Sequence, residues 1–165
     1  MNAISKTVAP GDTAALTEAL RADLQANHSN IPDALRQLKA WVVWKVAHND
    51  PVRGKFGKVP VYPTNGGNRC GTQGSPEDRA GLGTWEQAFA AFQRDPSLAG
   101  VGIAMLPDFG VVALDADKCV SQLDGRPSVA DHAHALCGST YTETSPSGSG
   151  VRAFWLQAGL SRTAG

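Results

Sequence analysis

The chain has 165 residues, 42% of them hydrophobic and 18% charged, which suffices for one domain with a buried core. Its formal net charge of +0 argues against a protein whose whole surface grips nucleic acid, and no apolar run approaches the roughly 20 residues of a membrane span. Its three cysteines are widely spaced and include no Cys-x-x-Cys pair, so we expect neither a disulfide framework nor a zinc site. This cysteine usage fits a cytoplasmic location.

The first 30 residues resemble an appendage. Residues 14–25 carry apolar side chains at helical spacing, with Asp12 or Thr13 as the cap, but their flanks are small and polar. We therefore expect a flexible N-terminal arm over residues 1–30 and a single domain over residues 31–165.

The next segments predict a strand pair and a loop. Residues 40–46 are aromatic and β-branched, which is typical of a strand, and residues 58–62 are its expected hairpin partner. Pro60 restricts the second strand to a sheet edge or a bulge. Residues 64–83 read as a long loop rich in Gly, Asn, Ser and Pro, and loops of that length are usually functional or mobile.

The second half of the chain predicts two helices and two further strand pairs. Thr84 and Gln87 form a capping box at the start of a helix. The predicted elements are a helix over 84–92, strands over 101–105 and 111–114 joined by a tight turn at Pro107-Asp108, a helix over 128–137, and strands over 141–143 and 151–156. The class is therefore α+β, with a mostly antiparallel sheet and flanking helices.

The most informative motif is Asp115-Ala116-Asp117, which ends the apolar run 110–114. Side chains at positions i and i+2 of a strand point to the same face, about 6.6–6.8 Å apart along the chain. Two carboxylates held this way can converge on one divalent cation or share two ions about 3.5–4 Å apart. Carboxylate oxygens suit Mg²⁺ and Mn²⁺, although a lone Asp-x-Asp is more often a strand that ends in an acidic turn.

A second motif occupies residues 144–152, Thr-Ser-Pro-Ser-Gly-Ser-Gly-Val-Arg. Its glycines let the backbone turn N–H groups toward an anion, and its serine hydroxyls add hydrogen-bond donors. Arg152 follows on a predicted strand, where its guanidinium can hold a phosphate in bidentate geometry. The candidate anion ligands are Ser145, Ser147, Gly148, Ser149, Gly150 and Arg152. Ser/Gly loops are more often plain hairpin connections, and the Gly-Lys-Ser/Thr ending of a Walker A loop is missing.

Taken in order, these segments resemble the primase–polymerase domains of phage and plasmid replication proteins, members of the archaeo-eukaryotic primase superfamily. The matching segments are WVVWK at 41–45, KVP at 58–60, TW at 84–85, GVGI at 100–103, ALDADKC at 113–119 and YTETSPSGSGVR at 141–152. Each segment alone is unspecific, but their common order is not, and together they span about Ile31 to Leu156.

The resemblance implies a DNA primase/polymerase that transfers nucleotides on a template, with a primase-like sheet (an RRM-like core). Asp115 and Asp117 would be the catalytic carboxylates that hold two Mg²⁺ or Mn²⁺ ions. Lys58, the Ser/Gly loop and Arg152 would bind the incoming nucleoside triphosphate. The implied partners are a DNA template, nucleoside triphosphates and a helicase domain or subunit, with no membrane.

Two departures from the family pattern keep an alternative open. Many members carry His where this chain has Arg152, and arginine cannot exchange a proton near neutral pH. A third acidic residue on a later strand has no counterpart before Gly165, so we expect the domain to be incomplete at its C-terminus. The alternative is a catalytically inactive nucleotide- or nucleic-acid-binding fragment of a replication protein, and a metal-dependent nuclease is a weaker option.

Overall fold

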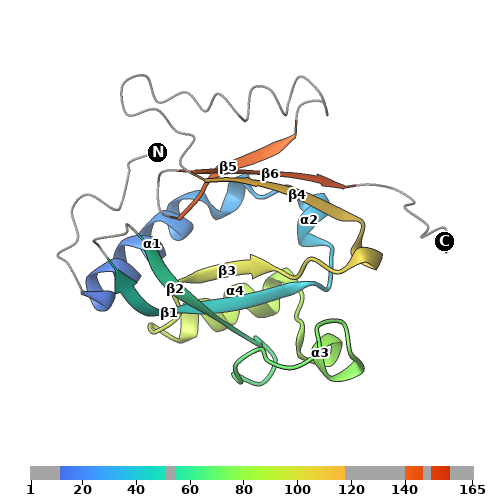
Figure 1. Ribbon diagram of the computed structural model, residues 1–165, viewed down its shortest axis with the longest axis horizontal. Helices are drawn as coiled ribbons and strands as arrows, with labels where there is room; N and C mark the ends of the chain where they lie inside the picture. Colours follow the sequence, from blue (N-terminus) through green and yellow to red (C-terminus); the bar gives the residue numbers. More distant parts are fainter. Residues whose placement is uncertain (1–11, 51–54, 118–139, 147–149, 157–165) are drawn as a thin grey trace.

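The structure is a computed structural model that describes residues 12–50, 55–117, 140–146 and 150–156. The chain is α+β as predicted, but its strands form two three-stranded antiparallel sheets, with the orders β2-β1-β3 and β4-β6-β5. Figure 1 shows the sheets as two layers, with α1 and α2 between them and α4 beneath the first sheet. Among the described residues, no helix combines the length and apolar character that crossing a bilayer requires.

The elements follow in chain order. They are α1 Thr13–Asn27, the 3₁₀ turn η2 His28–Asn30, α2 Asp33–Arg36, β1 Trp41–Asp50, β2 Lys55–Val61, α3 Pro76–Gly81, α4 Trp85–Arg94, β3 Gly100–Ile103, the 3₁₀ turn η3 Pro107–Phe109, β4 Val111–Ala116, β5 Tyr141–Thr144 and β6 Val151–Leu156. The helix predicted over 128–137 lies outside the described residues.

The first sheet is organised around its middle strand, β1. The hairpin of β1 and β2 extends closer to its turn than predicted and contains a register shift between Val46 and His48. Pro60 lies in β2, which is an edge strand of this sheet, as its missing N–H group requires. On one face, β1 packs against α4, whose Trp85 ring meets the Trp41 ring edge-on at 4.9 Å.

The capping box predicted for α4 is present. The Gln87 N–H donates to the Thr84 hydroxyl at 3.3 Å, and the Thr84 N–H donates to the Gln87 side chain at 3.0 Å. The helix buries Trp85, Ala88, Ala91 and Phe92 in the main core. Because residues three and four apart share a helix face, this spacing directs the apolar stripe toward β1.

Residues 12–30 are packed into the domain, which differs from the arm expected over residues 1–30. Leu16 and Leu20 of α1 are buried beside Ala99. The Arg21 guanidinium donates to the carbonyls of Asp95 at 3.0 Å and Leu98 at 2.5 Å. The helix was predicted correctly, with Asp12 as its cap, but its small polar flanks concealed how well its leucine stripe fits the first sheet.

Strands β3 and β4 are not a hairpin, although only a short segment joins them. After β3, Leu106 is buried with Leu82 and Ala104, and η3 then turns the chain. Gly110 ends this turn with φ of 63°, a left-handed conformation that glycine adopts without strain. The tight turn expected at Pro107-Asp108 is therefore present as η3, but it leads the chain from the first sheet to the second and does not join a hairpin.

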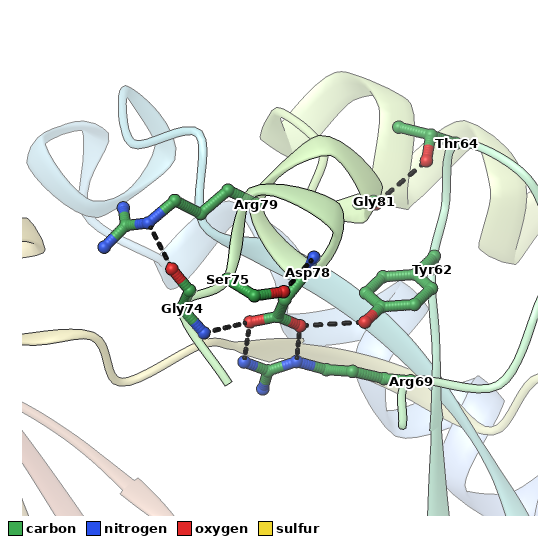
Figure 2. Close-up of polar contacts among 8 residues, drawn as sticks. All are labelled: Tyr62, Thr64, Arg69, Gly74, Ser75, Asp78, Arg79 and Gly81. Carbon is green, nitrogen blue, oxygen red and sulfur yellow. Dashed lines mark hydrogen bonds and ion pairs between the residues drawn. The ribbon is translucent and has the colours of Figure 1, made fainter. Parts of the chain in front are cut away.

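The segment 64–83, expected to be a loop, contains α3 and is held by a buried carboxylate, Asp78. Figure 2 shows Asp78 accepting hydrogen bonds from the Tyr62 hydroxyl at 2.8 Å, from two nitrogens of Arg69 at 2.7 and 2.9 Å, and from the Gly74 N–H at 2.7 Å. The Ser75 hydroxyl caps α3 by accepting from the Asp78 N–H. One side chain therefore ties the end of β2 to α3.

We predict that Asp78→Asn destabilises the protein by about 3 kcal/mol or more, because Arg69 is then buried without its counter-charge. Hydrogen bonds and the Arg69 charge hold the pKa of Asp78 well below its usual range. This contribution is therefore complete at neutral pH and is lost progressively as the pH falls below about 4, where the unfolded carboxylate takes up a proton. Urea unfolding at several pH values measures both effects.

The matched control for this prediction is Asp108→Asn. Asp108 also binds an arginine in bidentate geometry, Arg79, with both distances 2.7 Å, but this pair is exposed. Screened surface pairs contribute little to stability, so the control should unfold close to the wild type. Equal losses of stability in the two variants would contradict the role given to Asp78.

Candidate active site

A cleft of about 590 Å³ lies between the facing sides of the two sheets. One wall comes from the first sheet and includes Trp44 and Lys58, and the other comes from the second sheet and includes Asp115 and Arg152. Helix α1 closes one side with Leu20, Asp23, Leu24 and Asn27. Another hollow of about the same volume lies beside α1 and Ser97, and none of the predicted site residues lines it.

Strand β4 brings one of the two predicted carboxylates, Asp115, to this cleft, whereas Asp117 is not among the described residues that line it. Asp115 lines the cleft together with Ala113, two residues earlier on the same face of the strand. Asp117 directly follows the last residue of β4, and its charge reaches Lys58 on the opposite wall. The Asp115 side chain is 57% exposed, so its carboxylate keeps the solvent access that a cation ligand needs.

Arg152 is the middle member of a row of charges that crosses the second sheet. The strand register pairs Arg152 with Asp115 on β4 and with Glu143 on β5. Arg152 Nε is 3.5 Å from Asp115 Oδ2, and Arg152 Nη1 is 3.9 Å from Glu143 Oε1. Neither contact has the short distance of a strong charge-assisted hydrogen bond. The guanidinium is therefore shared between two acids and is not locked onto either.

Lys58 faces this row from the first sheet. Its Nζ lies 5.2 Å from the centre of the Trp44 ring and 5.3 Å from that of Phe56, and the two rings stack 6.1 Å apart. Desolvation, followed by repulsion from Arg152, lowers the pKa of Lys58 to about 8, against the attraction of the carboxylates nearby. The ammonium thus changes its charge close to physiological pH.

Glu143 belongs to the cleft although we assigned it no role from the sequence. Its Oε2 accepts a hydrogen bond from the Tyr141 hydroxyl at 3.1 Å, two residues earlier on the same face of β5. Burial raises the pKa of Glu143, and Tyr141, Arg152 and Lys58 counteract part of this shift. A signal was present in the sequence, because residues 143 and 152 are placed symmetrically about the predicted loop and antiparallel pairing makes them neighbours.

The base of the Ser/Gly loop is closed by two hydrogen bonds. The Ser145 N–H donates to the Gly150 carbonyl at 2.8 Å, and the Gly150 N–H donates to the Ser145 hydroxyl at 3.0 Å. Ser145 is buried, so its hydroxyl holds the loop together in this structure. A side chain at Gly150 would place its Cβ 2.6 Å from the Ala116 carbonyl oxygen, so glycine lets the loop approach the end of β4. Ser147, Gly148 and Ser149 lie outside the described residues.

The two tryptophans of β1 have different environments. Trp41 is 4% exposed and belongs to the core, as is usual for an aromatic residue on a strand. Trp44 is half-buried, lines the cleft and donates from its indole Nε1 to the Val101 carbonyl at 3.0 Å. Its ring lies against the backbone of Gly100, which has no side chain to separate them. Trp44 therefore provides an apolar surface beside the charged part of the cleft.

The oxygen donors of this cleft fit a hard divalent cation bound together with an anion. Mg²⁺ is commonly held by one or two carboxylates, with water and substrate phosphates completing its shell. Asp115 is one such carboxylate in the cleft, Asp117 follows two residues later just past the end of β4, and the cations Arg152 and Lys58 line the same cleft. Within the described ranges, no group of three or more His, Cys, Asp or Glu side chains is gathered as a complete ligand shell. The cysteines and histidines that lie outside those ranges are Cys119, Cys137, His132 and His134.

The chain matches no family model and no curated protein. The charged cleft and the order of the sequence motifs are the two observations that bear on its function. The cleft brings together Lys58, Asp115 and Arg152, and it adds Glu143 to them.

We predict that the pKa of Lys58 depends on the charges of Arg152 and Asp115 on the opposite wall of the cleft. Arg152→Ala should raise this pKa by removing a repelling cation, and Asp115→Asn should lower it further by removing an attracting anion. The pH dependence of amine labelling at Lys58, followed by mass spectrometry, measures both shifts. Arg94→Ala serves as the control, because Arg94 ends α4, the helix that packs beneath the first sheet. Shifts of equal size and sign in all three variants would refute the cross-cleft coupling.

Proposed function

We propose that this chain is a nucleotidyl-transfer domain of the primase–polymerase type, which binds a nucleoside triphosphate and divalent cations between its two sheets. The observation that carries the proposal is the convergence of Lys58, Asp115 and Arg152, from β2, β4 and β6, on one cleft. These residues come from three of the six segments that resemble the family in order. The DNA template and a helicase partner are expected from the resemblance alone.

Each side chain of the cleft has a separate task in this proposal. Divalent ions at Asp115 and Asp117 would supply charge neutralisation and activation of the attacking hydroxyl. Arg152 offers a planar pair of donors to a phosphate, whereas Lys58 offers a compact positive charge from the other wall. A phosphate near Lys58 favours its protonated form, so binding should be accompanied by uptake of a proton at Lys58 above about pH 8.

The cleft has a charged portion and an apolar portion, a combination that suits a nucleotide. Its charged side chains come mainly from β2, β4, β5 and β6, while Leu24, Ile31, Met105 and Phe154 give it an apolar portion. A nucleotide likewise joins a charged phosphate group to a base with apolar faces. Trp44 lies beside Lys58 and offers a ring surface where the two portions of the cleft meet.

A binding module without turnover is the second candidate. It is favoured by the scarcity of carboxylates, because the described residues contain no gathered set of three metal-ligating side chains in which two ions could be fully enclosed. Such a module would keep the fold, the cleft and the affinity for triphosphate, and would lose the transfer step.

The decisive experiment combines Mn²⁺ binding with labelled-nucleotide incorporation on a primed DNA template. We expect Asp115→Asn and Asp117→Asn each to abolish Mn²⁺ binding at the cleft and to stop incorporation, without a change in thermal unfolding. Calorimetric titration measures Mn²⁺ binding, the labelled product measures incorporation, and a circular-dichroism melt measures thermal unfolding. Asp108→Asn, which removes an exposed carboxylate at η3, is the matched control and should behave as the wild type.

The possible outcomes separate the candidate functions. Triphosphate binding without incorporation would favour the binding module, and degradation of the template would identify a nuclease. Unchanged Mn²⁺ affinity in both aspartate variants would refute the metal site itself.

We also predict that Arg152→Ala weakens binding of a nucleoside triphosphate by at least about tenfold, and binding of the corresponding nucleoside much less. Arg152→Lys should recover only part of the loss, because lysine keeps the charge but not the paired donors. Intrinsic tryptophan fluorescence, to which Trp41 and Trp44 in the cleft contribute, can report both titrations. Equal losses for nucleoside and triphosphate would place Arg152 away from the phosphates.

A further inference from the structure

The charge row of the second sheet has one fixed end and one open end. At the fixed end, Glu143 is 35% exposed, and one of its oxygens accepts from the Tyr141 hydroxyl while the other faces Arg152. Tyr141 in turn packs against Phe154 with ring centres 6.0 Å apart. At the open end, Asp115 is 57% exposed. Glu143 is therefore the better-anchored partner of Arg152, although Asp115 is slightly nearer to it.

This asymmetry matters when a cation binds at Asp115. The Arg152 guanidinium lies 3.5 Å from Asp115, close to the oxygens that a cation would contact. Binding a cation there places two positive groups on one carboxylate, which is unfavourable unless Arg152 has another counter-charge. Glu143 is on the other flank of Arg152 at 3.9 Å and can provide it without any change of strand register.

We propose that Glu143 is a positioning residue that holds Arg152 while a divalent cation takes Asp115. Arg152 competes with the cation for Asp115, and Glu143 weakens that competition by retaining the guanidinium on its own side. The same retention leaves Arg152 beside the cation, where a phosphate can contact both. This inference rests on the proposed metal site and adds to it the reason for an acid at position 143.

Two other roles for Glu143 make different predictions. If Glu143 were itself a metal ligand, its loss would weaken cation binding whether or not Arg152 is present. If it acted only through its negative charge at a distance, the loss would likewise be about the same in both backgrounds. Only the positioning role makes the effect of Glu143 depend on Arg152, because it acts through that residue.

A double-mutant cycle on Mn²⁺ affinity tests the proposal, with the full chain, Mn²⁺ alone and no nucleotide. Glu143→Gln should weaken Mn²⁺ binding by about fivefold, and Arg152→Ala should strengthen it by a similar factor. In the Arg152→Ala background, Glu143→Gln should change the affinity by less than about twofold. Glu143→Asp, which keeps the charge on a shorter side chain, should restore part of the loss. Glu86→Gln, on the first turn of α4, is the control and should have no effect.

The outcomes distinguish a failure of the proposed metal site from a failure of the positioning role of Glu143. If the wild type does not bind Mn²⁺ through Asp115, the proposed function fails and this inference fails with it. If the wild type binds but Arg152→Ala does not strengthen binding, or Glu143→Gln weakens it equally in both backgrounds, the positioning role alone is overturned. Should Glu143→Gln not fold, Glu143→Asp takes its place in the cycle, because a positioning role requires it to weaken Mn²⁺ binding when Arg152 is present and to leave it nearly unchanged in the Arg152→Ala background.

Discussion

The antiparallel register of β4, β6 and β5 determines the chemistry of the cleft. Because β6 is the central strand, Arg152 has one acid on each side, and a slip of one residue would turn it to the opposite face. The register is secured at its end by the paired hydrogen bonds between Ser145 and Gly150 and by the close approach of Gly150 to Ala116. Ser145 and Gly150, at the base of the Ser/Gly loop, therefore stabilise the strand register.

The protein separates the charges that stabilise it from those that face the cleft. Asp78 is 2% exposed and bound by four close donors, so it is a fixed part of the scaffold. The ion pairs of Arg152 are longer and partly exposed, and such pairs contribute little to stability. Arg152 can consequently exchange partners at small cost. The core around α4 and β1 also includes Val111 of β4, with Tyr141 and Phe154 packed against it, so the two sheets share this core.

Local signals in the sequence predicted the elements well. The capping box of Thr84 and Gln87, the leucine spacing of α1 and the edge position of Pro60 each depend on neighbours within a few residues. The errors all concern partners distant in sequence. Residues 64–83 appeared to be a loop because nothing local reveals that Asp78 meets Tyr62 and Arg69. The leucines of α1 were set apart from the domain because their contact, Ala99, comes much later in the chain.

By itself the sequence determined which groups are available: a pair of carboxylates at the end of a strand, a Ser/Gly hairpin loop with an arginine after it, and a lysine beside a proline. These follow from strand alternation and turn chemistry, which are properties of short segments. Only the tertiary structure decided that β3 and β4 lie in different sheets, and that Lys58 therefore faces Asp115 and Arg152 across a cleft. It also decided that Glu143 joins them. The physical reason is that layer packing depends on the burial of whole faces of sheets and helices, and no short segment contains that information.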